Sequence, residues 1–211
     1  MTGANVTSLI SSTIAILKAT TKDYNIVNDD NRLGEAFHDA GRGLLLVEEA
    51  LQTAKTQLDG RGLAGDPQSA MSSLEACNTK AKLSESMFKD VAQAPETSRF
   101  ERYKAAVQQQ GKGKTAEVLT LGMMKDVCDL AENDTVKATM IDQVKGLRDA
   151  IDKLSTMEPS VPNKGSGNTF NSYGFGNQFN APGGTQNNNT GSGNQFPGAT
   201  FPGTVNFGKN P

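Results

Sequence analysis

The sequence predicts an all-α protein, an antiparallel bundle of five or six helices, followed by a C-terminal segment of different character. Apolar residues recur at spacings of three and four along residues 6–157, and no stretch has the alternation of a β-strand. After Val161 the composition changes: the last 49 residues hold 11 Gly, 11 Asn and six of the nine Phe, but no Leu, Ile or Met. We therefore expect a helical domain over 1–158, a linker over 159–167 and a separate motif over 168–211.

Two helices are expected in the first 60 residues. The first has its apolar positions at Val6, Leu9, Ile10, Ile14 and Leu17. The second shows the clearest pattern, an apolar stripe of about four heptads from Leu33 to Leu58. Gly60, Gly62 and Gly65 end it.

Three or four further helices are expected before residue 158. Asp66 and Pro67 predict the start of one, because aspartate caps a helix and proline suits its first position, and Pro95 ends it. A shorter helix follows from about Ser98 to Gly111, with three residues expected to face inward: Phe100, Tyr103 and Val107. The remaining two cover about 115–131 and about 134–157, and the last includes Val136 and Met140 among its apolar positions. Pro159 then stops the chain from continuing as a helix.

Charge argues against nucleic-acid binding. The formal net charge is -2, and the only charged side chains after residue 162 are Lys164 and Lys209, so the helical part carries -4. Binding to phosphates needs a cluster of Lys and Arg, which this part lacks. The apolar run near the N-terminus has no basic residue ahead of it, and no window reaches the roughly 20 apolar residues of a membrane span. We therefore expect a cytoplasmic protein.

No catalytic, cofactor-binding or metal-binding site is expected. The stretch GKGKT, Gly111–Thr115, lacks the glycine of a nucleotide-binding loop at position 108, which is Gln, and follows no predicted strand. His38 is the only histidine, and we expect it at the edge of the core. Cys77 and Cys128 lie at apolar helix positions, as reduced core thiols would. Without a nucleophile–histidine pair or converging carboxylates, we predict that the protein is not an enzyme.

The C-terminal segment repeats itself. Gly-Asn-Gln-Phe occurs at Gly176–Phe179 and again at Gly193–Phe196, and each copy precedes a glycine-containing turn. The segment is too poor in apolar residues to offset the backbone entropy of ordering, about 1–2 kcal/mol per residue, so we expect it to be disordered in a monomer. Stacked on copies of itself it gains backbone hydrogen bonds, Asn and Gln ladders and stacked rings, which predicts a β-solenoid amyloid on polymerisation. An inert flexible tail and a phase-separating tail are the alternatives. The residues that we expect to carry the motif are Gly176, Asn177, Gln178, Phe179, Gly193, Asn194, Gln195, Phe196, Phe201 and Phe207.

Both parts of the chain resemble known fungal domains. GNQFNAPGGTQNNNTGSGNQFPGATFPGTVNFG (176–208) resembles the prion-like amyloid signalling motifs that filamentous fungi place at the ends of NLR receptors and their partners, most of all the type called sigma. SLISSTIAILKATTKDY (8–24), LGEAFHDAGRGLLLVEEALQTAK (33–55), CNTKAKLSESMFKDV (77–91) and RYKAAVQQQGKGKTAEVL (102–119) resemble the SesA domain, the N-terminal domain on NACHT and other P-loop NTPases. The occurrence of both resemblances in one chain is more specific than either of them alone.

The resemblance implies a signal-transduction effector or adaptor without enzymatic activity. An activated NLR or NACHT receptor with a matching motif would template the C-terminal motif into amyloid. The resulting homo-oligomer or polymer would cluster the helical domains in incompatibility, defence or programmed cell death. The alternative is a helical scaffold protein with an inert, flexible, low-complexity tail.

The first helix allows two interpretations. Its apolar residues are Leu9, Ile10, Ile14, Ile16 and Leu17. In relatives of the HET-S type the N-terminal segment enters the membrane, which implies membrane contact after activation. Here the apolar run is short and contains Ser11, Ser12 and Thr13, which favours packing against the bundle.

Overall fold

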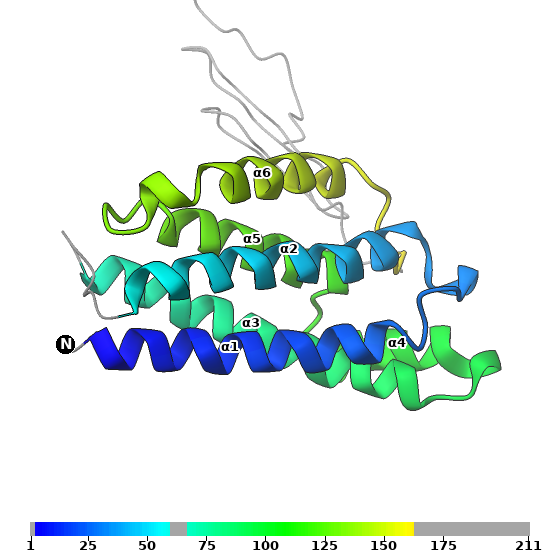
Figure 1. Ribbon diagram of the computed structural model, residues 1–211. Helices are drawn as coiled ribbons and strands as arrows, with labels where there is room; N and C mark the ends of the chain where they lie inside the picture. The colour runs from blue at the N-terminus through cyan, green and yellow to red at the C-terminus, as the bar shows by residue number, and fades with distance from the viewer. Residues whose placement is uncertain (1–2, 60–66, 163–211) are drawn as a thin grey trace, which may run out of the picture. The chain divides into compact units, whose positions relative to one another are not determined.

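The computed structural model describes residues 3–59 and 67–162, which form a bundle of α-helices (Figure 1). The helices are α1 (Gly3–Tyr24), α2 (Glu35–Leu58), α3 (Pro67–Gln93), α4 (Arg99–Gln109), α5 (Ala116–Leu130) and α6 (Ile141–Ser155). Three short 3-10 turns join them: η1 (Asn31–Leu33), η2 (Glu96–Ser98) and η3 (Lys137–Thr139). These residues contain six α-helices and no β-strand, which confirms the predicted fold class.

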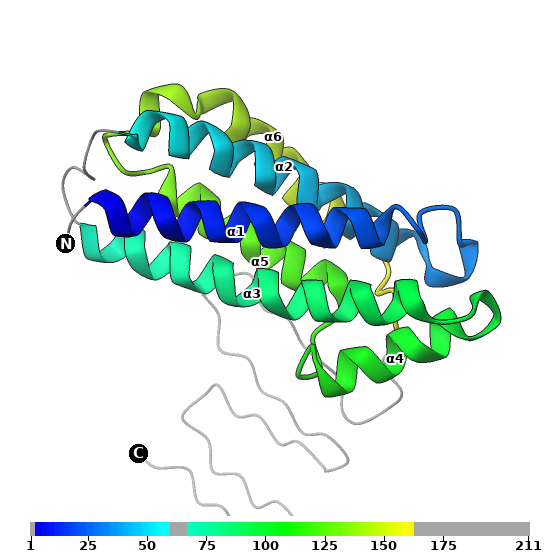
Figure 2. The same cartoon turned by 60° about the horizontal axis from the view of Figure 1, so that its bottom comes forward.

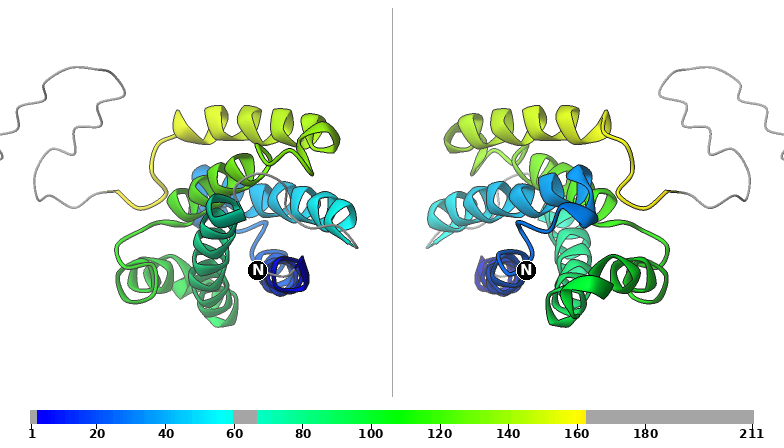
Figure 3. Two further views of the ribbon diagram at one scale, coloured as in Figure 1. Left: turned by 90° about the vertical axis from the view of Figure 1, so that its left-hand side faces the viewer. Right: turned by 90° about the vertical axis from the view of Figure 1, so that its right-hand side faces the viewer.

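Four helices form a ring around the main core. In the order α1, α2, α5 and α3, each contacts the next, and α3 closes the ring on α1 (Figure 2). The short α4 lies against α3, and α6 covers α2 and α5. Leaving α4 aside, each helix runs back along the one before it, so that α1 and α3 point the same way (Figure 1). Seen along α1, α2 and α6 are tilted and appear from the side (Figure 3).

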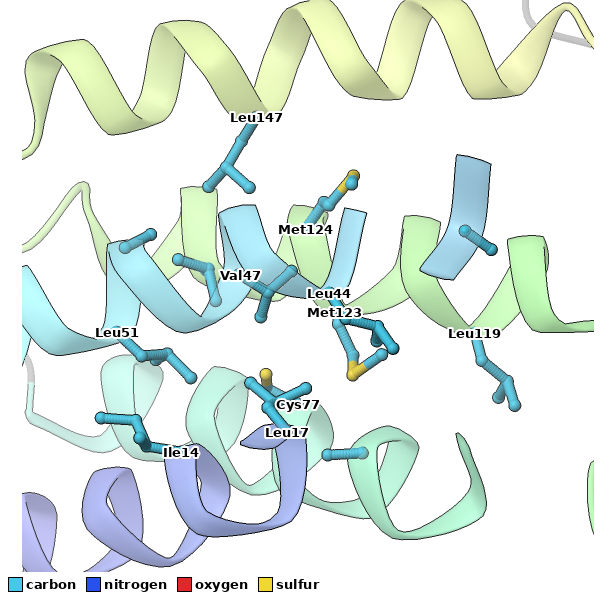
Figure 4. Close-up of a cluster of buried hydrophobic side chains, with 14 of the residues drawn as sticks. Ile14, Leu17, Leu44, Val47, Leu51, Cys77, Leu119, Met123, Met124 and Leu147 are labelled. Carbon is cyan, nitrogen blue, oxygen red and sulfur yellow. The ribbon is translucent and has the colours of Figure 1, made fainter. Parts of the chain in front are cut away.

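Aliphatic side chains from every helix of the ring meet at its centre (Figure 4). Those labelled there come from α1 (Ile14, Leu17), α2 (Leu44, Val47, Leu51), α3 (Cys77) and α5 (Leu119, Met123, Met124). Leu147 points toward them from α6, outside the ring, and all of these side chains are buried. An aromatic cluster fills the end of the bundle nearest α4. The ring of Phe37 lies 4.8 Å from the ring of Phe88 and 4.8 Å from that of Tyr103, between centroids. The three-four spacing in the sequence thus corresponds to the buried faces of the helices.

Two close contacts between helices require glycine in α2. A Cβ atom on Gly41 would overlap the ring of Tyr24, from the end of α1. A Cβ atom on Gly43 would lie 2.5 Å from the Met124 methyl carbon and 2.9 Å from the Thr120 methyl carbon, both on α5. These two glycines let α2 approach both of its neighbours in the ring.

The predicted last helix, about 134–157, starts too early. The structure begins α6 at Ile141, and residues 131–140 form turns and η3. Asn133 accepts a hydrogen bond from the Thr135 backbone N–H at its side-chain oxygen, 3.2 Å, which offers the backbone an alternative to helix. Val136 and Met140 are buried as expected, but they lie in the segment between α5 and α6 and not in a helix.

Two smaller expectations were also inaccurate. Leu33, expected on the second helix, is buried in η1, and α2 begins at Glu35. Phe100 was expected to face inward with Tyr103 and Val107, but it is only half-buried, and the Lys104 ammonium lies 5.0 Å from its ring centroid.

Candidate functional site

The ten residues expected to carry the C-terminal motif lie outside the described residues. The same holds for Asp66, the expected cap of the third helix. Pro67 is the first residue of α3, as expected.

The apolar residues of the first helix lie in or against the core. Ile10, Ile14 and Leu17 are buried, while Leu9 and Ile16 are half-buried and pack against that cluster. A polar contact also holds this helix: the Asn78 side-chain amide of α3 donates to the Thr13 hydroxyl, 2.9 Å, within the buried interior. Among the described residues, no helix is both long and apolar enough to cross a membrane.

The most specific polar site of the described residues lies where the chain leaves the helices. Figure 1 shows residues 156–162, the strap, leaving the end of α6 and running toward the start of α2. Ser160 of the strap is 6% exposed, and both of its donors bind one carboxylate. Its backbone N–H donates to Glu117 Oε1 at 3.0 Å, and its hydroxyl donates to Glu117 Oε2 at 2.7 Å.

Tyr103 completes this site, and we call Tyr103, Glu117 and Ser160 the clamp. The Tyr103 hydroxyl accepts the backbone N–H of Ala116, 2.9 Å, and lies 2.7 Å from the Ser160 hydroxyl oxygen. Because Ser160 gives its proton to Glu117, the Tyr103 hydroxyl donates to the Ser160 oxygen, with Glu117 Oε2 as a second, longer acceptor at 3.4 Å. Burial, followed by the nearby charge of Glu117, raises the pKa of Tyr103 above its ordinary value, which keeps the phenol protonated. The hydrogen bonds therefore run in one direction, from Ala116 through Tyr103 and Ser160 to Glu117.

Local sequence explains how the clamp is built. The GKGKT stretch forms the turn between α4 and α5, with positive φ at Lys112 and Gly113, 52° and 79°. This turn places Glu117 in the first turn of α5, facing Tyr103 of α4. On the other side of Ser160 lies Gly34, whose φ of 77° and ψ of 153° suit only glycine. A Cβ atom there would lie 3.7 Å from the Ser160 Cα atom.

An ion-pair cluster lies near the clamp, at the start of α2. The buried Asp30 carboxylate accepts from Arg32 Nε at 2.8 Å and from Arg99 Nη1 at 3.4 Å. The hydrogen bond from Arg32 is the main reason why the pKa of Asp30 lies below its ordinary value. His38 donates from Nε2 to the backbone carbonyl of Asp30 at 3.0 Å, so it is a core residue bound at the edge, as expected. A cavity of about 480 Å³ opens between this cluster and the strap, and Phe100, Met157 and Pro162 are among its lining residues.

Other sequence candidates take structural roles. The GKGKT turn joins two helices, α4 and α5, whereas a phosphate-binding loop of this type follows a β-strand. Cys77 is buried and Cys128 only half-buried, and both are free thiols. Burial raises the pKa of Cys77 to about 12, so this thiol is a poor nucleophile. In residues 3–59 and 67–162, no group of three His, Cys, Asp or Glu side chains could hold a metal ion.

One protein family matches the part of the chain that forms the helical ring. The model of the SesA family, described as an N-terminal domain on NACHT NTPases and P-loop NTPases, matches residues 10–130. This range begins at Ile10 within α1 and ends with α5, so it includes α2, α3, α5 and most of α1, the four helices of the ring. The chain belongs to the SesA family.

A second family model matches the C-terminal part of this SesA chain. The sigma domain, described as a domain on NACHT NTPases, matches residues 167–208, which we call the sigma segment. Both resemblances seen in the sequence are thus confirmed, and both domains are of types found on NACHT NTPases. No curated protein and no solved structure matches the chain.

The clamp connects the SesA region to the stretch that follows it. Tyr103 and Glu117 belong to the SesA region, whereas α6 and Ser160 follow it in the sequence. Within the expected linker, 159–167, Ser160 is buried on the SesA region and Val161 packs against its core. The sequence gives no sign of this, since Ser160 pairs with residues 43 and 57 positions away.

Proposed function

We propose that this SesA protein is a non-enzymatic adaptor or effector in signalling by NACHT receptors. One observation carries the proposal: a single chain joins a SesA region to a sigma segment, and both are described from NACHT NTPases. Its one P-loop-like stretch, Gly111–Thr115, is a turn between helices. The nucleotide-dependent step therefore belongs to the receptor, and this chain receives the signal.

The chemistry of the sigma segment supports templating as the means of transfer. Between residues 167 and 208 it has no charged side chain, so identical segments stack without repulsion. Its two Gly-Asn-Gln-Phe repeats supply amide and ring ladders at matching places. An activated receptor that presents a matching segment offers the edge on which the first chain folds, and each added chain extends that edge.

Clustering of the helical bodies is the output of this proposal. The helical body, residues 1–162, is a compact unit separate from residues 163–211, so it is carried along when the latter assemble. A high local concentration of bodies would then trigger incompatibility, defence or cell death. Membrane contact by α1 would have to remove Ile10, Ile14 and Leu17 from the core. The alternative role is a scaffold whose tail is inert.

The test compares the natural segment with a scrambled one of the same composition in the full chain. Each is fused to a fluorescent protein and expressed with a receptor that carries a matching sigma segment. Templating requires register, so we expect heritable foci and signalling with the natural order and neither with the scrambled order. Equal signalling by both chains, with diffuse fluorescence, would favour the scaffold role.

A further inference from the structure

The clamp fixes how many residues separate an anchored point of the helical body from the sigma segment. Ser160 is held by Glu117 and Tyr103, and the sigma match begins at residue 167. Only residues 161–166 lie between them, and the first of these, Val161, packs against the core. Six residues span at most about 20 Å when fully extended.

If the two repeats of each chain form two layers of a polymer, the helical bodies attached by this short tether are crowded together. Strands in a cross-β stack repeat every 4.7–4.8 Å, so a chain with two repeats adds roughly 9.5 Å of length. A body of 162 residues has a radius of gyration of about 15 Å and is about 40 Å across. About four bodies must therefore share each 40 Å of polymer, and they must spread sideways around it to avoid overlap.

Opening the clamp nearly doubles the tether. If Ser160 leaves Glu117 and Tyr103, the chain is free from the end of α6 at Ser155, and residues 156–166 precede the sigma segment. Eleven residues span about 36–40 Å, close to the diameter of one body. The side chains that hold α6 itself, such as Leu147 and Leu154, keep their places in the core.

We propose that the Tyr103–Glu117–Ser160 clamp is a conformational restraint on polymerisation, which holds the tether short in the resting chain and opens as bodies gather along the polymer. This inference rests on the proposed templating function. Closing two hydrogen bonds on one buried carboxylate favours the short tether, and crowding of the bodies favours the long one. The clamp therefore sets how readily the full chain joins a growing polymer.

The experiment measures seeded polymerisation of the full chain, with sonicated polymer of the full chain as seed. Ser160→Ala removes one donor to Glu117 and the acceptor of Tyr103, while Ser155→Ala, an exposed serine five residues earlier, is the matched control. A hydrogen bond to a charged group changes an equilibrium by roughly tenfold or more. We expect Ser160→Ala to elongate several-fold faster than wild type, and Ser155→Ala to elongate at the wild-type rate.

A longer linker separates the restraint from a general loss of stability. Six Gly and Ser residues inserted after Pro162 lengthen the tether while the clamp stays closed. We expect this insertion to speed elongation as Ser160→Ala does, and Ser160→Ala to add no further increase in the chain that carries the insertion. If Ser160→Ala acts by loosening the body, the two changes will instead multiply.

Hydrogen exchange reports the state of the clamp directly. In the monomer the Ser160 amide is buried and bonded to Glu117, so peptides covering 156–162 are protected. We expect this protection to be lost in the polymer, and to fall about tenfold in monomeric Ser160→Ala. Wild-type polymers that grow at the same rate as Ser160→Ala and keep the strap protected would overturn the restraint but leave templating intact. A full chain that never polymerises on seeds, even with the inserted linker, would overturn both.

Discussion

Single residues in this protein depend on partners that are distant in the sequence. Ser160 is buried only because Glu117 and Tyr103, 43 and 57 residues earlier, accept and donate its hydrogen bonds. Leaving any one of these polar groups unpaired in the interior costs about 1–3 kcal/mol. The three residues therefore act as one unit.

The close contact between Gly41 and Tyr24 gives a prediction for a single residue. In Gly41→Ala the new methyl group overlaps the Tyr24 ring, so we expect a loss of about 1–3 kcal/mol in unfolding free energy. Gly146→Ala is the matched control, because a Cβ atom on Gly146 in α6 meets nothing within 4 Å. Alanine removes conformational freedom from the unfolded chain, so we expect this control to gain about 0.5–1 kcal/mol. Urea unfolding followed by circular dichroism measures both, and a stabilising Gly41→Ala would contradict the packing of α1 on α2.

The lowered pKa of Asp30 predicts how stability depends on pH. Its folded pKa lies below the ordinary value of 3.8, so its contribution is present above that value and is lost as pH falls through the folded pKa. The difference in unfolding free energy between wild type and Asp30→Asn should therefore be largest near neutral pH and shrink below about pH 4. Urea titrations from about pH 7 to pH 3 test this. The exposed neighbour Asp29 supplies the control variant Asp29→Asn, and a difference that grows in acid would contradict the assignment.

At the scale of helices, the sequence was sufficient wherever one apolar stripe ran between clear breaks. Leu44, Val47 and Leu51 repeat at helical spacing on α2 and are all buried. The prediction failed over residues 134–140, because Val136 and Met140 keep helical spacing although they lie in turns. The signal was the polar run Asn133-Asp134-Thr135, whose side chains compete with helix hydrogen bonds. The spacing of apolar residues predicts which side chains are buried. It predicts a helix only where no residue of the segment competes for the backbone hydrogen bonds.

The attachment of α6 gives a prediction at the scale of the element. This helix lies outside the SesA match and packs on α2 and α5 through Leu147, 1% exposed. Lys153 adds an ion pair to Asp39 of α2, 2.6 Å between Nζ and Oδ2. Leu147→Ala should cost about 2–5 kcal/mol because it leaves a cavity between three helices. Ile141→Ala on the same helix is the control, since Ile141 is 67% exposed, and we expect a change within about 0.5 kcal/mol. Equal effects in thermal unfolding would mean that α6 is not docked as described.

At the scale of the whole molecule, the chain joins two regions with opposite requirements. The SesA region contributes most of the buried apolar core, and its helices were predictable from local spacing. The sigma segment has no Leu, Ile or Met, so its proposed ordering depends on stacking against copies of itself. The sequence therefore predicts that it can polymerise, but not the detailed structure that it adopts. The clamp, which holds the strap on the SesA region, was not predictable because its partners are brought together only by the complete bundle.

The two repeats in each sigma segment lead to a prediction about the mass of the polymer. If each Gly-Asn-Gln-Phe copy forms one layer of the stack, a chain of 22.3 kDa occupies roughly 9.5 Å of polymer, which gives about 2.3 kDa per Å. Scanning transmission electron microscopy of unstained full-chain polymers measures this quantity. The helical signal in circular dichroism should persist beside a new β signal, because the bodies stay folded. The control is a chain in which the second Gly-Asn-Gln-Phe copy is scrambled. We expect this chain not to form polymers of the wild-type mass per length. A value near 4.7 kDa per Å would mean one layer for each chain, and would show that the two repeats do not stack as successive layers.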